Sequence, residues 1–316
     1  MAKLSKSVID KINSYDKSVK NTEIAEELWI NRNTVAKYRN KVSNEIVDAL
    51  TKDERKKLDL IERYTPKQLQ ELLYNLQLDT KQSIEEVIGE PGYIKLALLS
   101  DTHYWNKHCA RDEIGEFMDI AKDRWVEAFI HSWDLVEGEW VFKWQVYELD
   151  KIGFDEQVKD VVENYPDTWI PTYLTQGNHD ESFLKKTGGD IGKAISLIRK
   201  DIINLWFYDA RVKLNWIDIN SHHGGWSMSY AKSYKIQKLL ENIDPKNQPN
   251  LFVSWHWHTA LYMFYRKIHS FLPWAFLKEN LLAKRFNLDN TIWGWIVEIE
   301  LDEKGWSKIN MEFIKL

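Results

Sequence analysis

The stretch YIKLALLSDTH, residues 93–103, decides the fold. It begins as an almost continuous apolar run, which is typical of a strand buried on both faces of a sheet, and leads into Asp101 and His103. Four later apolar runs end in the same way, namely VEAFIHSWD at Asp134, IPTYLTQGNHD at Asn178, His179 and Asp180, WIDINSHH at His222 and His223, and NLFVSWHWH at His256 and His258. Since α/β sheets place their ligand sites at the C-terminal ends of strands, we expect these side chains to share one site.

The side chains at the five strand ends offer oxygen and imidazole donors and no thiolate. Such a set suits Mn²⁺, Fe or Zn²⁺ at a hydrolytic site, and Mn²⁺ is our first choice. A single histidine in such a place is more often structural, but six of the nine histidines fall at these ends. Without His179 and Asp180, and with one of the adjacent His222 and His223, seven candidate ligands remain. Seven are too many for one ion, so one shared carboxylate would divide them over two ions about 3.5–4 Å apart, the spacing of two-metal phosphoryl chemistry.

The ordered motifs DTH (101–103), Asp134, GNHD, SHHGG and HWH resemble those of the calcineurin-like metallophosphoesterases. The resemblance covers residues 93–316 and implies an α/β fold, a four-layer αββα sandwich of two mixed sheets flanked by helices. It implies that one metal is held by Asp101, His103, Asp134 and His258, and the other by Asp134, Asn178, His222 and His256. Two adjacent histidines compete for one position, and strand alternation with the following HGG turn favours His222 over His223.

The resemblance also implies a mechanism in which metal-bound hydroxide attacks the phosphorus of a phosphoester. His179 would be the acid beside the leaving oxygen, because the intrinsic pKa of imidazole lies near neutral pH, and Asp180 would orient its ring. Purely structural support of the turn is the alternative for His179.

Tryptophan stands where the resemblance leads us to expect glycine. Glycine usually precedes the bridging Asp and the His-x-His pair, because the backbone turns sharply there, but this chain has Trp133 and Trp255. The same exchange is suggested at Trp29, Trp105, Trp226 and Trp274. The chain has 16 tryptophans and only 13 glycines. We hypothesise that many of these tryptophans are native glycines encoded by UGA in a recoded gene; an aromatic wall of real tryptophans is the alternative.

Residues 1–44 predict a separate all-α domain. TEIAEEL and RNTVAKYRNKV read as two short helices joined by the turn WIN, and together they resemble the helix-turn-helix of bacterial and phage regulators. The second helix would present five side chains to DNA, namely Arg32, Asn33, Thr34, Lys37 and Arg39. A trihelical domain that docks a protein is the alternative. Residues 45–92 are charged and read as a helical connector.

Charge and cysteine content restrict the partners and the compartment. Residues 1–44 hold nine Lys and Arg against five Asp and Glu, which is +4 and leaves −9 for the remainder of a chain whose net charge is −5. A basic N-terminal segment (residues 1–44, here called the head) on an otherwise acidic chain suggests that the head binds an anionic partner. A lone cysteine, Cys109, fits a reducing cytosol, and no apolar run is long enough to span a bilayer, so we expect a cytoplasmic protein without membrane contact.

The function predicted from these features is hydrolysis of phosphodiester bonds by a dinuclear metal site, with DNA a candidate substrate. Two other functions stay open. One is a protein or nucleotide phosphatase whose head docks a partner, and the other is a non-catalytic DNA-binding protein that retains a hydrolase body. Fold resemblance alone does not choose among them.

Overall fold

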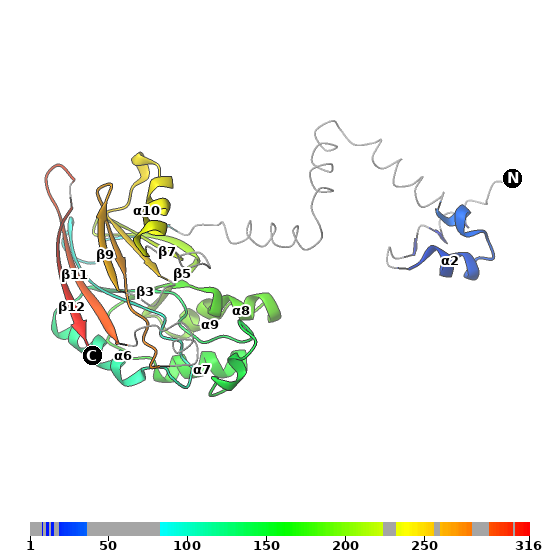
Figure 1. Ribbon diagram of the computed structural model, residues 1–316, viewed down its shortest axis with the longest axis horizontal. Coiled ribbons are helices and arrows are strands. Elements are labelled where there is room, and N and C mark those ends of the chain that lie inside the picture. The colour runs from blue at the N-terminus through cyan, green and yellow to red at the C-terminus, as the bar shows by residue number, and fades with distance from the viewer. Residues whose placement is uncertain are drawn as a thin grey trace. The chain divides into compact units, whose positions relative to one another are not determined.

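The computed structural model describes residues 8, 11–12, 14–15, 19–36, 83–223, 232–255, 260–279, 291–305 and 307–316. The chain divides into two compact units, Met1–Gln77 and Leu78–Leu316. The larger unit contains both sheets and is drawn from cyan to red in Figure 1.

The described residues form two sheets of six strands each. The first has the order β12-β11-β2-β3-β4-β5 and consists of β2 (Tyr93–Ser100), β3 (Ala128–Ser132), β4 (Thr172–Gln176), β5 (Ile202–Phe207), β11 (Trp293–Leu301) and β12 (Ser307–Lys315). Strands β2 to β5 are parallel, and the hairpin β11–β12 joins β2 antiparallel. The second has the order β1-β6-β7-β8-β10-β9 and consists of β1 (Ser83–Glu86), β6 (Asp209–Leu214), β7 (Ile217–His223), β8 (Leu251–Trp255), β9 (Leu261–Tyr265) and β10 (Ile268–Leu272).

Strand β2 is apolar at nearly every position because both of its faces are buried. Leu96 and Leu98 belong to the core between the two sheets, whereas Ala97 and Leu99 belong to the core beneath the helices of the first sheet. Those helices are α6 (Arg111–Asp123), α7 (Phe154–Asn164), α8 (Asn178–Thr187) and α9 (Ile191–Ile198), and Figure 1 shows them gathered on one side of the unit. Helix α10 (Lys232–Asn242) packs on the second sheet. The predicted four-layer α/β sandwich is therefore confirmed.

All five strands expected from the apolar runs are present, as β2, β3, β4, β7 and β8. The structure differs from the prediction within residues 45–92. Residues 45–82 lie outside the described part of the chain, but Ser83–Glu86 form strand β1, which pairs with β6, rather than a helix. A four-residue strand with two glutamates has no apolar run to reveal it.

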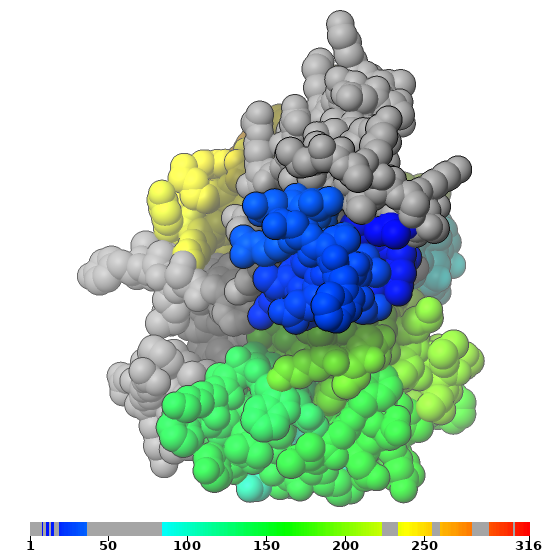
Figure 2. Space-filling model, turned by 90° about the vertical axis from the view of Figure 1, so that its right-hand side faces the viewer, coloured from blue at the N-terminus to red at the C-terminus, as the bar shows by residue number. Residues whose placement is uncertain are grey.

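The smaller unit has a small apolar core of its own. Helix α2 (Asn21–Glu27) is followed by a turn and by helical residues 32–36, and Ile24 and Ala25 pack with Ile12 and Val35. Figure 2 shows the described residues of this unit as a compact blue cluster. Arg32 and Asn33 are exposed and Thr34 is half-buried, while Lys37 and Arg39 lie outside the described residues. The helix-turn-helix therefore stays a prediction.

No helix among the described residues is long and apolar enough to cross a membrane.

Candidate metal centre

The loops that follow β2 and β3 run side by side at the C-terminal edge of the first sheet. Asp101 N–H donates to Trp133 O (3.0 Å) and His103 N–H donates to Asp134 O (2.9 Å), which extends the parallel pairing beyond the strands. The φ angles of Asp101, His103 and Asp134 are 47°, 45° and 45°, in the left-handed region. Such conformations cluster at functional sites, where the surrounding structure compensates their cost. Three of the expected ligands thus lie on left-handed backbone at this edge.

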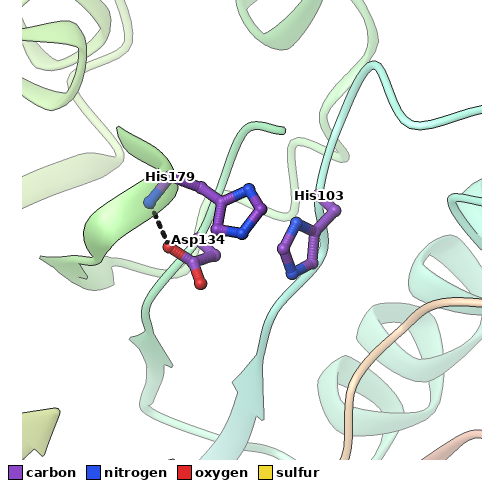
Figure 3. A group of neighbouring side chains, drawn as sticks. All are labelled: His103, Asp134 and His179. Atoms are coloured by element: carbon purple, nitrogen blue, oxygen red, sulfur yellow. Dashed lines mark hydrogen bonds between the residues drawn. The ribbon is translucent and has the colours of Figure 1, made fainter. Parts of the chain in front are cut away.

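Three of the predicted site residues converge at this edge. His103, Asp134 and His179 each offer a donor atom, and these atoms lie within 4.8 Å of one another. The rings of His103 and His179 meet edge to face with centroids 4.6 Å apart, and Asp134 lies beside them (Figure 3). His179 N–H donates to Asp134 Oδ1 (2.9 Å), which fixes the start of α8 against the carboxylate. A carboxylate and two imidazoles at this spacing can hold a divalent ion.

Asp101 lies next to this group and is itself buried. Its Oδ1 is 3.8 Å from His103 Nε2, and its Oδ2 has no hydrogen-bond partner among the described residues. Burial, together with the negative charge of Asp134, raises the pKa of Asp101. Two carboxylates that are forced together in a buried place need a cation to stay ionised, so the donor set fits a metal.

Glu137, which the sequence analysis missed, orients both histidine rings. His103 Nδ1 donates to Glu137 Oε2 (2.8 Å), and His179 Nδ1 donates to the backbone oxygen of Glu137 (2.7 Å). The carbonyl oxygen can only accept, so Nδ1 of His179 carries a proton and Nε2 is the nitrogen available for chemistry. For His103 the same logic leaves Nε2 as the atom that could bind a metal, in the carboxylate–histidine arrangement that many metal sites use.

Gln145 holds Glu137 in place. Its Nε2 donates to Glu137 Oε1 (2.8 Å) and to Glu137 O (2.7 Å) from the short 3₁₀ helix η1 (Gln145–Tyr147). Burial alone would raise the pKa of the Glu137 carboxyl, but nearby His179 and the hydrogen bond from His103 outweigh burial and lower it. Glu137 therefore remains an ionised acceptor. Its position three residues after Asp134 was the only signal that the sequence offered.

Asp180 lies in a different place from the one expected. Its carboxylate accepts backbone N–H groups from Gly177 (2.8 Å), Val136 (3.0 Å) and Leu135 (3.3 Å), and it therefore ties the loop after β3 to the start of α8. The contacts to the His179 ring nitrogen come from Glu137 and, at 3.5 Å, from Gln145. Asp180 thus shapes the site through the backbone and does not orient the ring as predicted.

Asn178 begins helix α8 and is buried at the same edge. The residue before it, Gly177, passes so close to the carboxylate that a Cβ there would lie 2.2 Å from Asp134 Oδ1. No other residue type fits between β4 and Asp134, which explains the glycine of the GNHD motif.

The second sheet meets this edge through two serines. Ser221 of β7 and Ser132 of β3 lie with their hydroxyl oxygens 3.1 Å apart. His222 follows Ser221 and therefore points to the opposite face of the strand. Its ring centroid lies 5.8 Å from that of Phe252, and its Nδ1 lies 3.8 Å from Asp209 Oδ1. The structure therefore does not bring His222 to the group of His103, Asp134 and His179.

The remaining predicted ligands fall on chain that the structure describes in part or not at all. The backbone of His223 pairs with Trp255 at the ends of β7 and β8, but its side chain lies outside the described residues. His256 and His258 also lie outside them, directly after β8. Their assignment as ligands stays a prediction.

Sequence comparison assigns the family. The model of the calcineurin-like phosphoesterase family matches residues 94–294, which include both site loops and the start of α8. The chain belongs to the calcineurin-like phosphoesterases. Membership supports a hydrolase that acts on phosphoesters, and the family uses divalent metals. The predicted resemblance is therefore confirmed.

Among solved structures, the chain is similar to an archaeal phosphodiesterase, with 15% identity over 71% of this chain and 100% of the other and a TM-score of 0.41. It is also similar to a putative 5′-nucleotidase from Staphylococcus aureus, with 10% identity over 71% and 54% and a TM-score of 0.44. A Vps29 from Entamoeba histolytica, complexed with zinc, matches with 11% identity over 70% and 99% and a TM-score of 0.36. No curated protein matches the chain.

Proposed function

We propose that this protein is a metal-dependent phosphodiesterase whose site holds two divalent ions, with Mn²⁺ the preferred ion. The observation that carries the proposal is the meeting of His103, Asp134 and His179 from three strand ends, beside the buried carboxylate of Asp101. One ion is assigned to Asp101, His103, Asp134 and His258, and the other to Asp134, Asn178, His256 and one of the histidines at the end of β7. For that last position we now prefer His223, because His222 contacts Phe252 and Asp209 instead.

The chain's own side chains would divide the remaining work. Bound ions would supply positive charge for the phosphoryl oxygens and would acidify a water molecule. Glu137 fixes the rings of His103 and His179, so that Nε2 of each is the free nitrogen. With Nδ1 protonated and tied to a carbonyl, His179 can carry a second proton on Nε2 and pass it to the departing alkoxide. We assign His179 as the general acid; its closeness to His103 and Asp134 makes a third ligand the competing role.

The proposed substrate class is a small phosphodiester or a short DNA end. Outside residues 1–44 the chain carries a net charge of −9, which disfavours a broad surface that tracks a long polyanion. The basic residues 1–44 would instead supply any affinity for DNA, and Arg32 and Asn33 are exposed there.

A panel of phosphoesters with added Mn²⁺ tests the proposal. We expect turnover of bis-p-nitrophenyl phosphate and loss of that turnover with a chelator, with Asp134→Asn as the inactive control. Turnover of the p-nitrophenyl monoester alone would favour the phosphatase alternative. Salt-sensitive binding to duplex DNA, without hydrolysis of any ester, would favour the non-catalytic alternative. The panel is also run on the double variant Trp105→Gly/Trp133→Gly. Turnover by this variant alone would show that the two indoles block the site, whereas no turnover by either chain would show that the activity is absent.

A further inference from the structure

Left-handed backbone in this chain is concentrated on tryptophan. Of the thirteen tryptophans whose backbone is described, eight have φ between 52° and 103°, namely Trp29, Trp105, Trp125, Trp133, Trp140, Trp169, Trp206 and Trp216. The chain has 14 tyrosines and 12 phenylalanines, yet Tyr208 is the one residue of these two types with positive φ in the described part. Bulky side chains avoid this region because Cβ meets the following carbonyl oxygen. Aromatic character therefore does not explain the pattern.

Two of these tryptophans end helices in the position that glycine normally occupies. After α2, Trp29 N–H donates to Glu26 O (3.3 Å) and Ile30 N–H donates to Ala25 O (3.0 Å). After α6, Trp125 N–H donates to Lys122 O (3.0 Å), and the next residue's N–H donates to Ala121 O (3.1 Å). This pair of bonds is the Schellman motif, whose left-handed residue is usually glycine.

A third tryptophan lies in a two-residue hairpin. Leu214 and Ile217 are paired at the ends of β6 and β7, so Asn215 and Trp216 form the whole loop, with φ of 48° and 71°. Two residues of positive φ define the type I′ turn, for which Asn-Gly is the preferred sequence. The indole occupies the glycine position of that pair.

Burial does not compensate the conformation at the exposed positions, whereas Trp105 (1% exposed) and Trp133 (0%) are buried. Trp29 is 95% exposed, and Trp125 and Trp169 are each 86% exposed. An exposed indole gains little from packing, so nothing in the fold favours tryptophan there over a smaller residue.

We infer that glycine is the native residue at all eight positions, and that the gene encodes it by UGA, which is read here as tryptophan and in the native cell as glycine. A re-read codon replaces one residue type by one other at scattered positions, whereas independent mutations would introduce many types. Adding these eight to the 13 glycines present gives 21 of 316 residues, close to the usual frequency of about 7%.

The inference separates the tryptophans into two groups. Trp293 and Trp295 lie in β11 and pack against Phe313, the first stacked and the second tilted, with ring centroids 4.2 and 4.3 Å from that of Phe313, so tryptophan is the native residue there. The inference also changes the list suggested by the sequence. Trp255 and Trp274 are not among the left-handed residues of the described chain, and Trp226 lies outside it, so the argument does not extend to these three.

Peptide mass spectrometry of the protein from its native cells tests the inference, together with the codons of the gene. We expect glycine and UGA at the eight positions, and tryptophan and UGG at Trp293 and Trp295. Tryptophan in the native peptides at these positions would overturn the inference, whatever the activity of the protein.

A pair of variants of the full chain tests the physical basis independently. Trp125→Gly and Trp125→Ala both remove the exposed indole, but alanine keeps the cost of a left-handed Cβ. We expect the glycine variant to have the higher Tm, by roughly 2–4 °C. Equal Tm values would show that backbone conformation does not disfavour a side chain at this position and would contradict the argument from φ.

Discussion

Two regions of the larger unit use tryptophan in opposite ways. At the edge that carries the proposed metal site, Trp105 and Trp133 lie in loops with φ of 83° and 82°, next to proposed ligands that are themselves left-handed. In the hairpin β11–β12, Trp295 lies on extended backbone, packs against Phe271 and Phe313, and donates from Nε1 to Leu272 O (3.3 Å). We infer from this comparison that the backbone conformation of the edge is determined by the proposed metal-binding side chains that it brings together. The backbone conformation of the β11–β12 hairpin is determined by side-chain packing. Substitutions should therefore change turnover at the edge and stability in the hairpin.

The largest separable effect on turnover is expected at His179. His179→Ala should lower kcat for a small phosphodiester by about 10²–10⁴, the usual contribution of a general acid, while both metals stay bound. Steady-state kinetics and metal content of the same preparation measure the two effects. Loss of metal from this variant would reassign His179 as a ligand.

In the hairpin, Trp295→Gly should lower the free energy of unfolding by about 2–3 kcal/mol, somewhat less than the loss for a fully buried ring, without changing kcat. Urea unfolding followed by fluorescence measures the stability. An unchanged stability, or a loss of turnover in the folded protein, would remove the distinction between the two regions.

At the site edge, Glu137→Gln should weaken metal binding or turnover by about 10–100-fold. The substitution preserves the shape of the side chain but removes the negative charge that orients His103. A titration with Mn²⁺ measures the affinity, and Glu137→Asp is the control that keeps the charge. Partial recovery in the aspartate variant is expected. If both variants bind Mn²⁺ as tightly as the unsubstituted chain, Glu137 only supports the loop.

The smallest effect is expected from removing residues 1–44, which are assigned to neither region. Turnover of a chromogenic diester should stay within about two-fold of the full chain, since every proposed ligand remains, while binding to duplex DNA at low salt should weaken. A collapse of turnover would place the head in the active site, and unchanged DNA binding would contradict its assigned role.

The sequence predicted most of the sandwich, and the strand ends at which His103, Asp134 and His179 come together, because burial on two faces leaves an unbroken apolar run. The run in β2 and the polar residues directly after it show both the strand and its ligand-bearing end. Strand β1 was missed because its short sequence, SIEE, carries two charges at the edge of a sheet.

The rest of the site depends on contacts that no local pattern records. Glu137 and Gln145 come from an irregular segment, and their roles arise only when the loop folds back on His103 and His179. The choice between His222 and His223 depends on which face of β7 meets the first sheet. The Ser221–Ser132 contact bears on that choice, and it joins segments that are far apart in the sequence.

The most direct test of the account is the amount of Mn²⁺ bound per full-length chain, with and without Asp134→Asn. If Asp134 bridges two ions at the edge of the first sheet, the unsubstituted chain should bind two ions and the variant at most one. Equal binding by both chains, or no binding by either, would contradict the dinuclear site on which the proposed hydrolysis depends.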